Sequence, residues 1–128
     1  MIKKELDGQE LPRFFPKEGV VWMCALGKNT GFEQNGVGNR FDRPALVVKK
    51  FNNQMYWTIP LSTKQKNLDF YYNFTDQGGN KVSAILAQLR LTSIKRFIRD
   101  MYEMDPGEFV AIRERLVGFF DRKSKPRT

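Results

Sequence analysis

Histidine is missing from all 128 residues of this chain, and its absence excludes several classes of catalytic site. Histidine is the side chain that most often gives or takes a proton near neutral pH. Serine–histidine–aspartate triads, cysteine–histidine dyads, histidine zinc sites and ribonucleases that use a histidine pair are therefore excluded. Any catalysis has to come from Arg, Lys, Glu, Asp, Tyr, Ser or Thr side chains.

Cysteine and long apolar runs are scarce as well. Cys24 is the only cysteine, which excludes an internal disulfide and an all-cysteine metal site, and we expect it to be a small buried residue. No apolar run approaches the roughly 20 residues that span a bilayer. The basic N-terminus lacks the apolar stretch of a signal peptide. We therefore expect a cytoplasmic protein with no metal, no other cofactor and no membrane partner.

Acidic residues are fewer than basic ones, which gives a net charge of +8 and a pI near 9.8. Such an excess favours a polyanionic partner, because Lys and Arg side chains bind phosphates and release counterions. It is equally compatible with a solubility feature or with an acidic protein partner. Charge alone therefore leaves nucleic acid and an acidic protein both open.

The chain is long enough for one domain, which we place at residues 19–121 between an extended lead-in (1–18) and a basic disordered tail (122–128). Runs of β-branched and aromatic residues between turn signals predict strands. These runs cover 20–26, 44–50, 55–59, 70–74 and 83–91. The first is followed by a Gly- and Asn-rich stretch, 28–42, which predicts a long loop. Pro60 is expected to end the third strand, and the turn at 51–54 makes the second and third a hairpin.

Two further features complete the predicted fold. The run 83–91 has a periodicity that fits strand or helix, and the preceding Gly-Gly turn favours a strand. Asp105 as N-cap, Pro106 at the first helical position and Glu108 at the third predict a C-terminal helix. Apolar residues then recur at helical spacing and are expected to pack in the core: Phe109, Ile112, Leu116 and Phe119. The sum is a mainly β, α+β protein: a small antiparallel barrel with a C-terminal helix.

Five segments resemble a known family when they are taken in order. They are Gly31-Phe-Glu-Gln-Asn-Gly36, Arg43-Pro44, Pro60-Leu-Ser-Thr63, Gln88-Leu-Arg90 and the helix 105–120. Together they resemble the MazF/PemK toxins over roughly residues 18–120. The resemblance implies an SH3-like antiparallel β-barrel of the CcdB/MazF type that forms a homodimer. It also implies cleavage of single-stranded RNA at short motifs without a metal, a cyclic phosphate and a 5′-hydroxyl as products, and inhibition by a cognate antitoxin.

The resemblance places the family's catalytic arginine at Arg43 and its catalytic threonine at Ser62. A planar guanidinium can bind two oxygens of a phosphate that gains negative charge as the ribose 2′-hydroxyl attacks it. The plainer alternative is a solvated arginine at a strand edge. Six residues, 37–42, separate Arg43 from Gly36 at the end of the Glu-Gln-Asn-Gly segment, where the family commonly has one or two, so the loop is longer here.

Hydroxyl and carboxylate groups complete the predicted catalytic set. Either Ser62 or Thr63 could hydrogen-bond the scissile phosphate, although such residues often only satisfy turn amides. Glu33 could be the general base, could recognise a base, or could be a solvated loop carboxylate.

Amide and basic side chains are the predicted RNA-binding groups, because they can contact base edges or phosphates. They are Gln34, Asn35, Arg40, Lys64, Gln88 and Arg90. Gln88 and Arg90 are expected to share one face of a strand, opposite Leu89.

Two other functions remain open on the same fold. One is a CcdB-like inhibitor that acts on DNA gyrase through protein contacts. The other is an SH3-like module that binds nucleic acid or an acidic protein without cleaving it. The Arg-Pro and Pro-Leu-Ser-Thr segments argue against the first, because gyrase binding needs no phosphate site.

Overall fold

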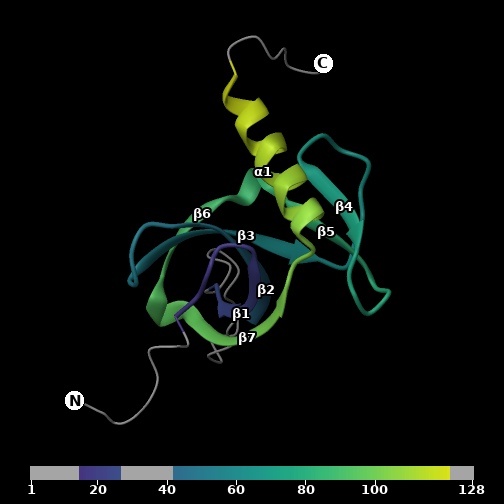
Figure 1. Cartoon of the computed structure of the whole chain (residues 1–128). Helices are drawn as coiled ribbons and strands as arrows, with labels where there is room; N and C mark the ends of the chain where they lie inside the picture. Colours follow the sequence, from purple (N-terminus) through teal and green to yellow (C-terminus); the bar gives the residue numbers. More distant parts are fainter. Residues whose placement is uncertain (1–14, 27–41, 122–128) are drawn as a thin grey trace, which may run out of the picture.

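The computed structural model describes residues 15–26 and 42–121 and shows a mainly antiparallel sheet with one C-terminal helix, α1 (Figure 1). The predicted fold class is thereby confirmed. The loop predicted at 28–42 lies outside the described residues except at its last position, where strand β2 already begins. Most of the lead-in and all of the tail lie outside them too.

Seven strands form the sheet, in the order β4-β5-β3-β2-β1-β7, with β6 paired to β3. Their bounds are β1 Val20–Ala25, β2 Asp42–Lys50, β3 Met55–Ser62, β4 Tyr71–Thr75, β5 Lys81–Ile85, β6 Arg90–Ser93 and β7 Phe97–Glu103, and α1 spans Pro106–Phe120. Short 3-10 turns, η2 (Leu86–Gln88) and η3 (Ile94–Arg96), flank β6. Within the described ranges no helix is long and apolar enough to cross a membrane.

The sheet curls on itself. Strand β6 pairs with β3, and β7 pairs with β1. Because only the three residues of η3 join β6 to β7, the sheet formed by β3, β2 and β1 has to curve round between them (Figure 1). The β4–β5 hairpin continues the sheet beyond the end of β3, on the side where α1 lies. The result is an open barrel with a helix at one end.

Two apolar clusters fill the two sides of the curled sheet. Leu46 and Val48 of β2 pack in the cluster that includes Ile112 of α1. Ala45 and Val47, which alternate with them, pack inside the barrel with Trp22, Cys24 and Tyr56. Strand β2 is buried on both faces, which is why its sequence is a continuous apolar run and does not alternate with polar residues.

The β2–β3 hairpin forms as predicted, but its second strand is longer. Asn52 Oδ1 accepts hydrogen bonds from the backbone N–H groups of Gln54 (2.7 Å) and Met55 (2.9 Å), which closes the turn. The prediction that Pro60 ends the strand is wrong, since β3 runs on to Ser62. Pro60 is paired with Ala45 at the end of the β2–β3 ladder, just before β3 pairs with β5. The N–H that proline lacks therefore falls where β3 changes its partner strand.

The prediction of a single strand at 83–91 is wrong. That stretch holds the end of β5, then η2, then the first two residues of β6. The backbone N–H of Leu86 donates to the Phe70 carbonyl (2.7 Å), which turns the chain out of β5. Strand β7 had no sequence prediction at all. Its pairing with β1 shifts register at two places, so its side chains do not follow the period-two pattern that reveals a strand.

Helix α1 begins and ends as predicted, but one residue of its predicted apolar face is exposed. Asp105 Oδ2 accepts hydrogen bonds from the N–H groups of Gly107 (3.0 Å) and Glu108 (3.2 Å), so it is the N-cap. Ile112 is fully buried, and Phe109 and Leu116 pack against the same cluster. The prediction that Phe119 lies in the core is wrong: it is 46% exposed, because the last helical turn extends past the core residues that cover Ile112.

Candidate active site

Arg43 lies on β2 at the end of the sheet where the described chain resumes after β1. It is paired with Cys24 of β1, and its side chain is exposed. The register pairs Ala45 with Pro60, and Arg43 and Ser62 each lie two residues further toward this end. Side chains two apart on a strand share a face. Beyond this step the two strands part: Arg43 stays paired with β1, whereas Ser62 pairs with Ser83 of β5.

The Ser62 hydroxyl is part of a turn. Its Oγ accepts a hydrogen bond from the Lys64 backbone N–H (3.0 Å), and Ser83 Oγ donates to the Lys64 carbonyl (2.9 Å). A hydroxyl that accepts one hydrogen bond can still donate its own proton. Thr63 and the Lys64 side chain are exposed. The turn therefore fixes where the Ser62 oxygen lies and keeps its proton available to a phosphate.

A hollow of about 190 Å³ lies beside these hydroxyls. Mainly apolar walls come from β2, β3, β5 and β7, and the polar groups come from the end of β3 and the β4–β5 turn. The lining residues are Pro44, Leu61, Ser62, Thr63, Asp76, Asn80, Val82, Met101 and Tyr102. The neighbour of Arg43 in the chain, Pro44, thus shares a hollow with both candidate hydroxyl residues. No sequence pattern singled out Asp76 or Asn80, because both are ordinary turn residues.

Two more arginines lie at the end of β1. Arg90 Nη1 donates to the Leu26 carbonyl (3.5 Å) and Arg96 Nη1 to the Ala25 carbonyl (3.4 Å). Both side chains are exposed. Arg43 is paired with Cys24, the residue just before Ala25, so three arginines lie at this end of β1. Sequence motifs contain Arg43 and Arg90 but not Arg96, which reaches the end of β1 because η3 turns the chain back toward that strand.

Cys24 is fully buried beneath the arginines, as predicted. Burial raises the pKa of its thiol to about 12, and the positive charge of Arg90 only partly opposes this. The thiol therefore stays protonated at neutral pH, and it is not a nucleophile, because the thiolate is the reactive form.

The remaining predicted residues divide into two groups. Gln88 is exposed in η2, and Leu89 follows η2 before Arg90 starts β6, so the expected strand alternation of these three residues does not exist. The predicted loop residues lie outside the described ranges: Glu33, Gln34, Asn35 and Arg40.

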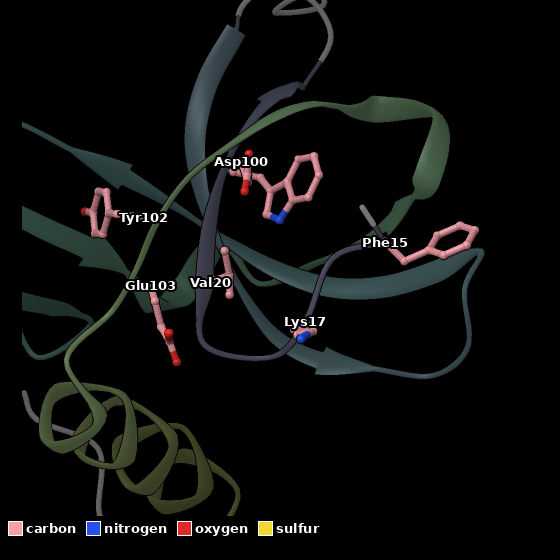
Figure 2. Close-up of a pocket in the computed structure, with 7 residues that line it drawn as sticks. Phe15, Lys17, Val20, Asp100, Tyr102 and Glu103 are labelled. Carbon is pink, nitrogen blue, oxygen red and sulfur yellow. The ribbon is translucent and has the colours of Figure 1, made fainter. Parts of the chain in front are cut away.

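A second hollow, of about 280 Å³, lies between the N-terminal segment and β7 (Figure 2). Its lining includes Asp100, Glu103 and one lysine, Lys17. Two carboxylates against one ammonium make it a poor place for a phosphate, whereas the end of β1 carries three guanidinium groups. In the described part of the chain no three His, Cys, Asp or Glu residues gather as metal ligands.

The sequence matches the PemK-like, MazF-like toxins of type II toxin–antitoxin systems across residues 17–120. The chain belongs to this toxin family. The match runs from before β1 to the end of α1 and includes every residue of the site described above, so the predicted family is confirmed. The curated proteins gave no match.

Solved structures share the fold at low sequence identity. MazF from Deinococcus radiodurans has a TM-score of 0.68 and is 17% identical, with 84% of this chain and 97% of that chain covered. A MazE–MazF structure from the same organism gives 0.69, 17% identity and coverage of 84% and 96%. An endoribonuclease from a mycobacterial species gives 0.59, 15% identity and coverage of 80% and 88%. These likenesses establish the fold.

Proposed function

We propose that this toxin is an endoribonuclease that cleaves single-stranded RNA at short sequence motifs. The observation that carries the proposal is the group of arginines at the end of β1, where Arg43 is paired with Cys24 and where Arg90 and Arg96 donate to the carbonyls of Leu26 and Ala25. A polyanion fits this concentration of positive charge. The mycobacterial endoribonuclease that shares the fold supports RNA as the substrate.

In the proposed reaction the ribose 2′-oxygen forms a bond to the adjacent phosphorus as the bond to the 5′-oxygen breaks. The products are a 2′,3′-cyclic phosphate and a 5′-hydroxyl. Arg43 binds the non-bridging oxygens as their negative charge grows, and the Ser62 hydroxyl donates to the same phosphate. Glu33 is the proposed base that takes the 2′-hydroxyl proton, and water supplies the proton for the leaving oxygen. No step requires a metal ion.

The other candidate residues are assigned to RNA binding. Arg90 and Arg96 bind flanking phosphates, and Thr63 and Lys64 border the path of the chain. Loop residues read the base edges, since their amides and guanidinium groups offer paired donors and acceptors. These are Gln34, Asn35 and Arg40; Gln88 lies further out in η2.

Two protein partners complete the proposal. A cognate antitoxin covers the basic site, and the MazE–MazF structure with this fold supports such a partner. A second copy of the chain packs on the outer side of α1. Val110, Val117 and Phe120 are 52%, 67% and 73% exposed there, which is unusual for three apolar residues on one helix.

The decisive experiment uses purified protein, single-stranded RNA and excess EDTA. Wild type should cut the RNA, and Arg43→Ala should cut it about 100-fold more slowly or worse, which is the loss seen when one charge-stabilising donor is removed. Lys49→Ala is the matched control, because Lys49 is an exposed cation near the other end of β2. It should cut at the wild-type rate.

Each alternative function gives its own result in this experiment. RNA that is bound but left intact would replace the proposal with a non-catalytic binding module. Absence of any RNA binding, with inhibition of DNA supercoiling by gyrase, would replace it with a CcdB-like inhibitor. Cleavage that stops on addition of EDTA would contradict the metal-independent mechanism, and native-rate cleavage by Arg43→Ala would contradict the assignment of Arg43.

A further inference from the structure

The hollow beside Ser62 and Thr63 combines apolar walls with a few polar groups. Pro44, Leu61 and Val82 form part of the wall, and Met101 and Tyr102 of β7 close the opposite side. Mainly apolar walls with a small number of polar groups are usual in pockets that bind small molecules. Pro44, which lines the hollow, directly follows Arg43 in the chain, so a base of an RNA whose phosphate binds Arg43 can reach it.

Asp76 gives this hollow its chemical character. Its Oδ1 accepts hydrogen bonds from the N–H groups of Gly78 (2.9 Å) and Asn80 (2.8 Å), and its Oδ2 accepts one from Asn80 Nδ2 (3.3 Å). A carboxylate has about four positions for accepting hydrogen bonds, so one position is left for a ligand. The turn amides therefore hold the carboxylate in place while it can still accept one more donor.

The charge of Asp76 acts on the far side of the hollow as well. Burial raises the pKa of Tyr102, and the negative charge of Asp76 raises it further. The hydrogen bonds from Asn80 and Gly78 lower the pKa of Asp76 itself, so the carboxylate is ionised at neutral pH. A negative acceptor disfavours phosphate oxygens here, in contrast to the arginine-rich strand end.

We propose that this hollow binds the nucleobase next to the scissile phosphate, and that Asp76 selects bases with an exocyclic amine and disfavours uracil. The inference rests on the proposed RNA cleavage. The amine of cytosine or adenine donates to a carboxylate, and an acidic side chain that accepts from the N4 amine of cytosine is a known form of base recognition. Uracil presents a carbonyl oxygen at the same place. Two hydrogen-bond acceptors would then face each other, with no proton between them.

The test is cleavage of a randomised single-stranded RNA library, followed by sequencing of the ends. For wild type, one position next to the cut should show uracil depleted about tenfold relative to cytosine or adenine, as expected for one good hydrogen-bonded contact to a base edge. Asp76→Asn should abolish this depletion at that position alone. An asparagine forms the same turn through Oδ1, and its amide N–H₂ can donate to the uracil carbonyl.

The matched control is Asp100→Asn, which makes the same change of charge in the second hollow (Figure 2). Its cleavage profile should equal that of wild type. The inference is overturned if wild type tolerates uracil at every position near the cut, or if Asp76→Asn keeps the wild-type profile. It is also overturned if Asp100→Asn changes the profile as much as Asp76→Asn does. A wild-type protein that cuts no RNA would instead contradict the proposed function, and the role of the hollow with it.

Discussion

The arginine-bearing end of the sheet and the face covered by α1 are built from opposite kinds of residue. At the first, Arg43, Thr63 and Arg90 are exposed. At the second, Leu46 and Ile112 are fully buried in one apolar cluster. Strand β2 belongs to both regions, since it carries Arg43 at its start and Leu46 three residues later.

This difference separates chemistry from stability along a single strand. Exposed charged side chains contribute little to the free energy of unfolding, whereas truncation of a buried aliphatic side chain is costly. The buried part of β2 therefore holds its charged start at a fixed place. Substitutions at the arginine-bearing end should leave the free energy of unfolding unchanged, and substitutions in the buried cluster should leave RNA cleavage unchanged. The following experiments test this separation.

The largest effect is expected for Ile112→Ala. Removal of a fully buried isoleucine should lower the free energy of unfolding by about 2–5 kcal/mol, while the RNA-cleavage rate per folded molecule stays that of wild type. Urea denaturation at one protein concentration measures the first and a cleavage assay the second. Leu68→Ala is the matched truncation at a 45% exposed position and should change stability by less than about 0.5 kcal/mol. A large loss of cleavage per folded molecule would show that the two regions are coupled.

Removal of a site arginine should affect RNA binding and spare stability. Each of Arg90→Gln and Arg96→Gln should reduce the slope of log affinity against log salt concentration by about 0.7, the value for one phosphate contact on a single strand. Fluorescence anisotropy with an RNA that carries a 2′-deoxy residue at the cut measures binding without cleavage. Lys49→Gln should leave the slope unchanged. An unchanged slope for Arg96→Gln would show that Arg96 does not contact an RNA phosphate.

A smaller effect on stability is expected at the start of α1. Asp105→Ala removes the acceptor for the Gly107 and Glu108 amides and should lower the free energy of unfolding by about 1 kcal/mol. Asp100→Ala removes a carboxylate from an exposed position on β7 and serves as the control. Equal stability of Asp105→Ala and wild type would mean that the cap contributes nothing to the anchoring of the helix.

Local sequence signals predicted the parts of the fold that depend on local physics. The cap at Asp105 and the hairpin turn at Asn52 are set by hydrogen bonds between near neighbours in the chain, and both formed. The motifs that contain Arg43 and Ser62 pointed to the family that the match over residues 17–120 shows.

The parts that sequence could not predict depend on contacts between distant segments. Strand β7 exists because β1 offers it an edge, and its register shifts hide the alternation. Phe119 fits the helical stripe, but its burial depends on how far the helix extends past the core. Asp76 joins the site only because the β4–β5 turn comes to lie beside the end of β3.

The smallest expected effect is a change in stability at acidic pH, and it concerns Asp76. Hydrogen bonds from Asn80 and Gly78 lower its pKa below that of an aspartate in the unfolded chain, which is about 3.9. A carboxyl group with a lowered pKa stabilises the fold at pH values above its unfolded pKa, and this contribution is lost as pH falls through the folded pKa.

Urea denaturation of wild type and Asp76→Asn from pH 7 to pH 3 should therefore give a difference in the free energy of unfolding that is constant above about pH 5. Below that pH, wild type should lose stability relative to Asp76→Asn. Asp100→Asn, which removes an exposed carboxylate outside this turn, is the control. A difference between wild type and Asp76→Asn that stays constant down to pH 3 would mean that the turn amides do not hold the carboxylate, and the fixed acceptor on which base selection depends would be lost.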